Sequence, residues 1–160
     1  QRMFEKFGNM DLEGLLRTAT AEKEEGGLEA LIDLALDNGL AKEDAEDYMD
    51  DIVDVFCTPL QAATAKLDKE AEEMGADGAW DDWKSVIEEM CITDEDLCIG
   101  IRKPEKNLAQ LYGNLLKLGF DKKKQVPEAI SKAAGLRKDI WLGIPSKKDV
   151  KEAALKYYKE

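Results

Sequence analysis

The feature that most constrains the fold of this chain is the spacing of its apolar residues, which recur every three or four positions along most of its length. This period places apolar side chains on one face of an α-helix. The two-residue alternation of a strand is nearly absent, and its best candidate is the short stretch 139–144. We therefore expect an all-α fold of about eight short helices, joined by short connections in a compact, bundle-like arrangement with little or no strand.

Residues that favour helix caps mark the boundaries of several expected helices. Asp11 and Thr58 are typical N-caps, and Gly75 is typical of a helix end. A further helix is expected from Lys42 to Phe56. The side chains expected on its buried face are Ala45, Tyr48, Met49, Ile52, Val53 and Phe56. The helix expected after Pro104 is predicted to bury Leu108, Leu111, Tyr112, Leu115, Leu116 and Leu118.

The composition argues against most enzyme chemistry. The chain contains no histidine, which is the commonest general base and the partner of nucleophilic serine and cysteine. Motifs that hold nucleotides or place a nucleophilic serine are absent from the sequence. Cys57, Cys91 and Cys98 are expected to be reduced thiols in or near the core, and they do not readily assemble the four ligands of a zinc site. We therefore expect no enzymatic activity, no cofactor and no metal.

The net charge of −12 is divided unevenly along the chain. Residues 1–100 carry 28 acidic and 8 basic side chains, a net charge of −20. Residues 101–160 carry 7 acidic and 15 basic side chains, a net charge of +8. We therefore distinguish an acidic helical region, 1–100, from a basic helical region, 101–160, which can still form one domain. Such an asymmetry bears on the partners of a protein rather than on its fold.

The densest acidic segment is 43–54. If it is helical, five of its carboxylates share one face. These residues are Glu43, Asp47, Asp50, Asp51 and Asp54. Because like charges at i,i+4 destabilise a helix by about 0.2–0.5 kcal/mol per pair, a stripe of them is costly if it only keeps the protein soluble. We interpret it as a surface that imitates a phosphate backbone and binds a basic nucleic-acid channel, although an ordinary solvated surface explains the same composition.

The basic region contains a second candidate site, for phosphate contacts. Its lysines are Lys122, Lys123, Lys124, Lys147 and Lys148. Segment 127–136 has the rhythm of the first helix and turn of a helix-turn-helix, and Ser146 is expected to cap the final helix. That last helix comes late and carries no Arg, Asn or Gln suited to reading bases. We expect non-specific, salt-dependent DNA contact here, or else a basic surface that pairs with the acidic half of the same molecule.

Three tryptophans are also candidates for an interface. Trp80 and Trp83 lie three residues apart and are expected to anchor the core. Trp141 lies in the candidate strand. A tryptophan left exposed would be a binding anchor, because this residue is enriched at the hot spots of interfaces.

Four segments resemble a group of short acidic proteins found on prophages and other mobile elements of gut anaerobes. These segments are 3–8 (MFEKFG), 38–48 (NGLAKEDAEDY), 58–63 (TPLQAA) and 142–145 (LGIP), the last of which runs on towards Tyr157-Tyr158. Some small proteins of this kind are anti-CRISPR inhibitors that bind a type II effector nuclease. The resemblance covers most of the chain and implies an inhibitor that works in the cytoplasm of a bacterial host cell. It supplies no catalytic residues.

Three functional hypotheses follow from the sequence. The first is a non-enzymatic inhibitor encoded by a mobile element, whose acidic surface binds a protein with a basic nucleic-acid channel, such as a type II CRISPR effector nuclease. The second is a DNA-binding accessory or regulatory protein that uses the basic C-terminal helices. The third is an assembly protein whose acidic and basic halves pair head-to-tail between copies. No apolar run approaches the ~18–20 residues of a membrane span, so we expect no membrane partner.

Overall fold

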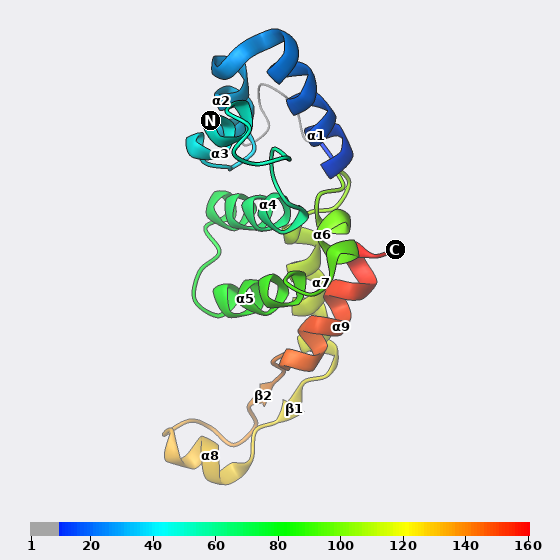
Figure 1. Cartoon of the computed structure of the whole chain (residues 1–160). Helices are drawn as coiled ribbons and strands as arrows, with labels where there is room; N and C mark the ends of the chain where they lie inside the picture. Colours follow the sequence, from blue (N-terminus) through cyan, green and yellow to red (C-terminus); the bar gives the residue numbers. More distant parts are fainter. Residues whose placement is uncertain (1–9) are drawn as a thin grey trace.

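The computed structural model describes residues 10–160, and 68% of them are helical, which confirms the predicted all-α class. The first four elements are α1 (Leu12–Ala21), the π-helical segment η1 (Glu22–Gly26), α2 (Gly27–Asp37) and α3 (Lys42–Met49). The central helices are α4 (Pro59–Met74), α5 (Ala79–Cys91), α6 (Glu95–Ile101) and α7 (Leu108–Asp121). The chain ends with β1 (Lys124–Gln125), α8 (Glu128–Ala133), β2 (Trp141–Leu142) and α9 (Lys147–Tyr158). Figure 1 shows an elongated molecule with α1–α3 at one end and α8 at the other.

The predicted helix caps at three positions are confirmed. The Asp11 carboxylate accepts a hydrogen bond from the backbone N–H of Gly14 at 2.7 Å. Thr58 and Gln61 form a reciprocal capping box, with N···O distances of 3.1 and 2.8 Å. Gly75 ends α4 in the left-handed conformation, with a φ of 68°, which glycine adopts without steric cost. These caps depend on neighbouring residues alone, and local sequence therefore predicts them.

The helix predicted from Lys42 to Phe56 is wrong in its second half, because α3 ends at Met49. Asp51 takes a left-handed φ of 59°, and the Ile52 N–H donates to the Asp47 carbonyl at 2.9 Å instead of continuing the helix. Three further carboxylates next to the negative end of the helix dipole would destabilise a longer helix. Of the residues expected on the buried face beyond Met49, only Phe56 is buried.

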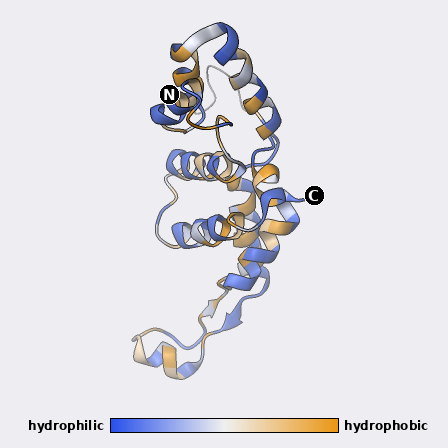
Figure 2. Cartoon of the chain, viewed as in Figure 1, coloured by the Kyte–Doolittle hydropathy of each residue, from blue (hydrophilic) through white to orange (hydrophobic). Residues whose placement is uncertain are grey.

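The described residues bury two clusters of apolar side chains, and α4 contributes to both. Ala62 and Ala65 face the first cluster, which α1–α3 complete. Ala63 and Leu67 face the second cluster, which α5, α6, α7 and α9 complete. Figure 2 shows the apolar faces of these helices turned toward one another. The division at residue 100 therefore separates the charges of the chain, whereas the packing divides at α4.

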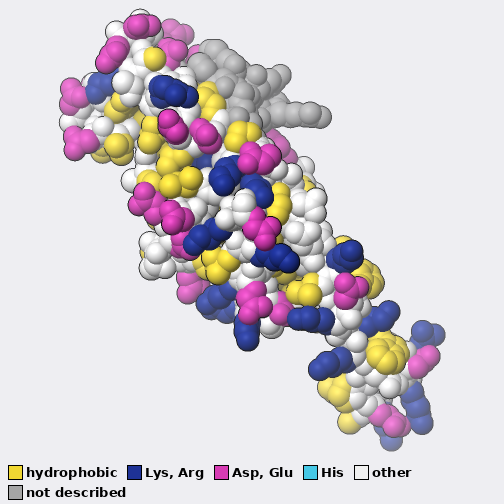
Figure 3. Space-filling view, turned by 90° about the vertical axis from the view of Figure 1, so that its right-hand side faces the viewer, with side chains coloured by type: hydrophobic (Ala, Val, Ile, Leu, Met, Phe, Trp, Pro, Cys, Tyr) yellow, Lys and Arg dark blue, Asp and Glu magenta, His cyan; other side chains and the backbone are white. Residues whose placement is uncertain are grey.

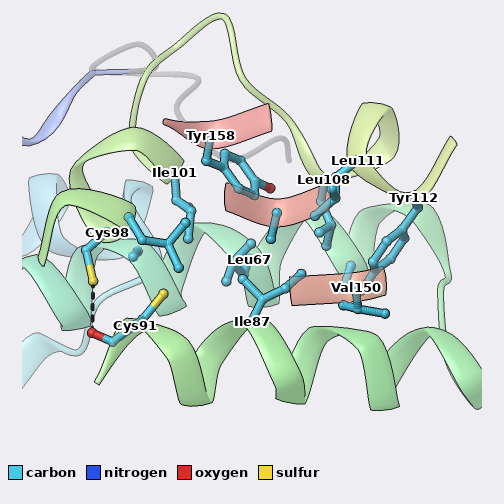
Figure 4. Close-up of a cluster of buried hydrophobic side chains, with 14 of the residues drawn as sticks. Leu67, Ile87, Cys91, Cys98, Ile101, Leu108, Leu111, Tyr112, Val150 and Tyr158 are labelled. Carbon is cyan, nitrogen blue, oxygen red and sulfur yellow. Dashed lines mark hydrogen bonds between the residues drawn. The ribbon is translucent and has the colours of Figure 1, made fainter. Parts of the chain in front are cut away.

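The second cluster is the larger one and includes two of the cysteines (Figure 4). The Cys98 thiol donates to the Cys91 carbonyl at 3.3 Å. Cys57 lies in the first cluster. All three thiols are buried and unbridged, which confirms the prediction that they belong to the core.

The two tryptophans of α5 also belong to the core, as predicted. Trp80 and Trp83 are partly buried against the second cluster, with ring centroids 4.8 Å apart. The Trp80 ring lies 5.1 Å from that of Tyr112, whose hydroxyl donates to the Trp80 carbonyl at 2.9 Å. These contacts fix α5 against α7.

A fully buried arginine connects the two clusters. The Arg102 guanidinium donates to the Asn38 side-chain oxygen at 2.9 Å and to the Ala62 carbonyl at 3.3 Å. The Asn38 amide also donates to the Leu34 carbonyl at the end of α2, at 2.9 Å. Burial lowers the pKa of Arg102 to about 10, which leaves it charged at neutral pH. The residue thus requires acceptors from α2 and α4 at once, and it fixes their relative position.

Lys66 of α4 is buried beside this arginine. Its ammonium donates to the carbonyls of Ile101, Lys103 and Lys106 at 2.7–2.8 Å. Burial lowers the pKa of Lys66 to about 8, so that the group is mainly charged at neutral pH and uses all three donors. The lysine holds the connection between α6 and α7 against α4.

An arm projects from the end of α7 and returns to α9 (Figure 1). Its strands β1 and β2 pair antiparallel, with Lys124 opposite Leu142 and Gln125 opposite Trp141. The candidate strand at 139–144 is therefore confirmed at two residues. The predicted helix-turn-helix is wrong, because α8 lies at the far end of the arm and β2 separates it from α9.

We predict that Asn38→Ala lowers the free energy of unfolding by about 1–3 kcal/mol, since it removes an acceptor from a buried cation. Urea titration followed by circular dichroism measures the change. Asn114→Ala is the matched control, because that residue pairs with Gln110 on the exposed face of α7, and it should alter stability by less than about 0.5 kcal/mol. Equal effects of the two substitutions would contradict the role given to Asn38.

Candidate partner-binding surfaces

The five predicted acidic residues do not form one helical face, which corrects the interpretation of segment 43–54. Glu43 lies in the first turn of α3 and is exposed, whereas Asp47 is partly buried near its end. Asp50, Asp51 and Asp54 are exposed, but they follow the helix in an irregular segment. The structure therefore brings together three of the five carboxylates in one loop.

We call residues 50–55 the acidic loop. Between its carboxylates it exposes the aliphatic side chains of Ile52, Val53 and Val55, which are 69%, 39% and 47% accessible. Asp51 pairs with the Lys23 ammonium, which also lies 4.5 Å from the centroid of the Tyr48 ring. The sequence pattern missed this loop, because it assigned Ile52 and Val53 to a buried helical face.

The other two carboxylates of the acidic loop form no ion pair within residues 10–160, although, besides the hydrogen bond to Asp51, the charge of Asp54 helps to raise the pKa of Lys23. Asp50 and Asp54 form no ion pair with any residue between 10 and 160, and the same holds for Glu43 and Asp47. The hydrogen bond to Asp51 raises the pKa of Lys23. A surface with unpaired carboxylates around exposed aliphatic side chains suits a protein partner that is both basic and apolar.

The second candidate surface is the basic arm, residues 122–146. Of the predicted lysines, Lys122 pairs with Asp149 at 3.7 Å and is otherwise exposed. Lys123 and Lys124 are exposed and form no ion pair within the described part of the chain. Figure 3 shows Lys and Arg side chains gathered around the arm at the lower end of the molecule.

The other two predicted lysines open α9 rather than the arm. Lys147 lies 3.8 Å from Glu89 of α5, and Lys148 lies 3.9 Å from Glu152 one turn further along α9. Both lysines are exposed. The structure thus leaves Lys123 and Lys124 of the predicted basic set without an ion pair within residues 10–160, whereas Lys122, Lys147 and Lys148 have acidic neighbours.

The arm also exposes large apolar side chains that the sequence pattern did not assign to a surface. The exposed residues are Ile130, Leu136, Trp141, Leu142 and Ile144. Trp141 is 56% accessible, and it is therefore an exposed tryptophan of the kind expected from the sequence to act as a binding anchor. Because nearly every residue between 121 and 142 is exposed, the arm has almost no core of its own.

Two adjacent hollows form an apolar groove at the base of the arm, which we call the arm groove. The first has a volume of about 320 Å³ and is lined by Leu116, Phe120, Lys123, Trp141, Leu142 and Gly143. The second has a volume of about 240 Å³ and is lined by Trp80, Trp83, Leu116, Gly143, Ile144 and Pro145. Leu116 was predicted to be buried and is instead half exposed in the floor shared by both hollows.

A close contact between two glycines holds the arm against α7. A Cβ atom on Gly119 would lie 2.6 Å from the Gly143 carbonyl oxygen. A Cβ atom on Gly143 would overlap the Gly119 carbonyl and lie 3.0 Å from the Lys123 Cα. Only glycine allows the two backbones to approach this closely, and this approach sets the shape of the arm groove.

The acidic and basic halves pair with each other only near α9 in the part of the chain described. Lys147 pairs with Glu89, and Lys159 pairs with Asp94 at 3.1 Å. The acidic loop and the basic arm lie at opposite ends of the molecule (Figure 1). Ion pairs neutralise part of each surface: Lys23–Asp51 at the acidic loop, and Lys122–Asp149, Arg137–Asp139 and Lys138–Glu128 at the arm. Within residues 10–160 they leave Asp50, Asp54, Lys123 and Lys124 without an ion pair.

Comparison of the chain with protein-family models, with curated proteins and with solved structures gives no match in any of the three. No group of three or more potential metal ligands lies close together within residues 10–160. Within the same residues, no helix has the length and apolarity needed to cross a membrane.

We predict that Gly143→Ala displaces the base of the arm from α7, because the new methyl group overlaps the Gly119 carbonyl. Trypsin should then cleave after Lys123 and Lys124 several times faster, as followed by mass spectrometry of timed digests. Gly113→Ala, on α7 and with nothing within 4 Å of the added methyl, is the control and should leave the digestion rate unchanged. Identical digests of the two variants would disprove the anchoring role of this contact.

Proposed function

We propose that this chain is a non-enzymatic inhibitor, encoded by a mobile element, that binds a nucleic-acid-handling protein. The binding surface is the acidic end of the molecule, which comprises the acidic loop and the α3 carboxylates of Glu43 and Asp47. The proposed partner is a type II CRISPR effector nuclease. The observation that carries the proposal is the acidic loop, where Asp50 and Asp54, which form no ion pair within residues 10–160, lie beside exposed aliphatic side chains. The resemblance noted above supports the same partner class.

The chemistry of such a partner matches this surface. An effector nuclease holds its nucleic acids in a positively charged channel and reads its target-adjacent motif with arginines. The carboxylates of Asp50 and Asp54 compete for these cations, and they steer the encounter at low salt. Ile52 and Val55 supply apolar contact that a nucleic acid backbone lacks. These apolar contacts would add to the affinity that the carboxylates provide by imitating phosphate groups.

We predict that neutralising the acidic end weakens binding to the nuclease by about tenfold or more, which corresponds to about 1.4 kcal/mol or more. The variant changes Glu43 to Gln and the other four residues to Asn: Asp47, Asp50, Asp51 and Asp54. Inhibition of DNA cleavage by the purified nuclease is measured together with a pull-down of the guide-loaded and the empty enzyme. Undiminished affinity of this variant would eliminate the acidic end as the binding surface.

A control variant removes the same charge from a different part of the surface. Its five substituted residues, all exposed, are Glu72, Asp77, Asp81, Asp82 and Asp96, each changed to its amide. This variant should retain inhibition, because it leaves the acidic loop intact. If both variants lose binding equally, net charge alone accounts for the affinity and the acidic loop has no specific role.

A second candidate function is DNA binding by the basic arm, and one observation favours it. Lys123 and Lys124 are exposed, form no ion pair with any residue from 10 to 160, and lie close to the exposed ring of Trp141. Lysines beside an exposed aromatic ring suit contacts with phosphates and bases. Such contacts would be mainly with phosphates, since the helix that follows the arm, α9, carries no Arg, Asn or Gln suited to reading bases.

We predict for this second function that the full-length protein binds duplex DNA with an affinity that falls steeply as salt rises. Each phosphate contact adds about −0.9 to the slope of log K against log salt, so Lys123→Gln with Lys124→Gln should make the slope shallower by about 2. Fluorescence anisotropy on labelled duplexes measures it. Lys151→Gln with Lys156→Gln, both exposed on α9, should keep the wild-type slope. Absence of binding at 50 mM salt would exclude this function.

A further inference from the structure

The acidic loop and the arm groove both expose apolar side chains, and Asp50 and Asp54 of the loop are opposite in charge to Lys123 of the groove. The loop lies near α1–α3, and α4 and α5 separate it from the groove at the base of the arm (Figure 1). We infer that the acidic loop of one copy of this chain docks in the arm groove of a second copy. The inference concerns self-association, and it does not depend on the function proposed above.

The arm groove has the properties of an incomplete interface. Leu116, Trp141 and Ile144 are 50%, 56% and 70% exposed. They line two adjacent hollows that share Leu116 and Gly143, and are therefore not scattered singly over the surface. Contiguous exposed apolar patches of this kind mark interaction sites in soluble proteins. Trp80 and Trp83 form one wall, and their ring contacts with each other and with Tyr112 restrict the motion of that wall. A rigid apolar groove requires little ordering when a partner binds.

The acidic loop offers a matching ligand. It projects three aliphatic side chains from irregular backbone, so these side chains can enter a groove without rearrangement of a helix. Asp50 and Asp54 flank Ile52 and Val53 and form no ion pair within residues 10–160. In the groove, Lys123 contributes to the lining, and Lys124 follows it on β1. Docking would bury aliphatic side chains against aromatic ones and place carboxylates beside unpaired ammonium groups.

The charge pattern favours a second copy over a nucleic acid as the occupant. A nucleic acid can pair with Lys123 and Lys124 and stack on Trp141, but it leaves Leu116, Ile144 and the two α5 tryptophans uncovered. An acidic aliphatic segment satisfies both parts of the groove. The chain itself carries such a segment, and its position at the far end prevents it from reaching the groove of its own molecule (Figure 1).

Docking of this kind joins different surfaces of the two copies. Each docked pair retains one free acidic loop and one free arm groove, so the contact is heterologous and can add further copies in a line. The assembly should therefore grow with concentration and shrink with salt, because charges at the rim are screened beyond about 10 Å at 0.1 M salt. It would also cover Asp50 and Asp54, so that self-association and binding of a basic partner compete.

The first test is sedimentation velocity of the full-length chain alone, from about 5 to 200 µM, at 50 and 500 mM salt. The weight-average sedimentation coefficient should rise with concentration at low salt and much less at high salt. A coefficient that stays monomeric over the whole range at 50 mM salt would overturn the inference. Because no nuclease or DNA is present, this outcome would leave the proposed function untouched.

A charge exchange then tests which surfaces meet. Asp50→Lys with Asp54→Lys should weaken self-association at least about tenfold, and so should Lys123→Glu with Lys124→Glu. Asp51 is left unchanged, because a left-handed φ disfavours lysine there. An equimolar mixture of the two variants should associate again, since the basic loop of one now meets the acidic arm of the other. Failure of the mixture to associate would overturn the pairing.

Apolar substitutions provide the final control. Ile52→Ser and Ile92→Ser change isoleucines of nearly equal exposure, 69% and 67%, and neither should alter folding. Only Ile52→Ser should weaken association, because Ile92 lies outside the acidic loop and the arm groove. Equal effects of the two substitutions would overturn the inference. Association that survives the loop variants but is lost on Trp141→Ala would identify arm-to-arm pairing instead and would also overturn it.

Discussion

The buried Arg102 guanidinium is the constraint on which the rest of the structure depends. A charged group in the core is tolerated only if acceptors surround it, and here these acceptors come from the end of α2 and from α4. Lys66 imposes the same requirement on the connection between α6 and α7. The two apolar clusters therefore have a fixed relative position, although each forms from its own set of helices. The acidic loop and the arm keep their separation because this central part is fixed.

Much of the fold could be predicted from the sequence, because helix caps and helical periodicity are local properties. Asp11, Thr58 and Gly75 act where the sequence placed them. The error at α3 arose because the apolar periodicity of the sequence continues through Ile52, whereas the helical backbone ends at Met49. The left-handed turn at Asp51 and the pairing of that residue with Lys23 involve a contact 28 residues away. No local pattern contains that information.

The candidate surfaces could be predicted in their charges but not in their shape. The count of acidic and basic residues along the chain was enough to locate the charged surfaces, since charged side chains are mostly exposed. The apolar part was missed because periodicity assigns every leucine and isoleucine to a core. Leu116 continues the buried face of α7 in the sequence, yet the arm leaves that position open. The groove arises from the close approach of Gly119 and Gly143, two residues 24 positions apart with no side chain to signal the contact.

The position of α4 between the two clusters has a consequence for cooperativity. The helix supplies one wall to each cluster, with Ala62 and Ala65 on one side and Ala63 and Leu67 on the other. Melting either cluster removes a wall of its neighbour, so the whole helical body should unfold as one unit. The arm contributes little to either cluster, and its opening costs far less than global unfolding. The arm can therefore change its conformation, and with it the shape of the arm groove, while the helical body between the acidic loop and the arm stays folded.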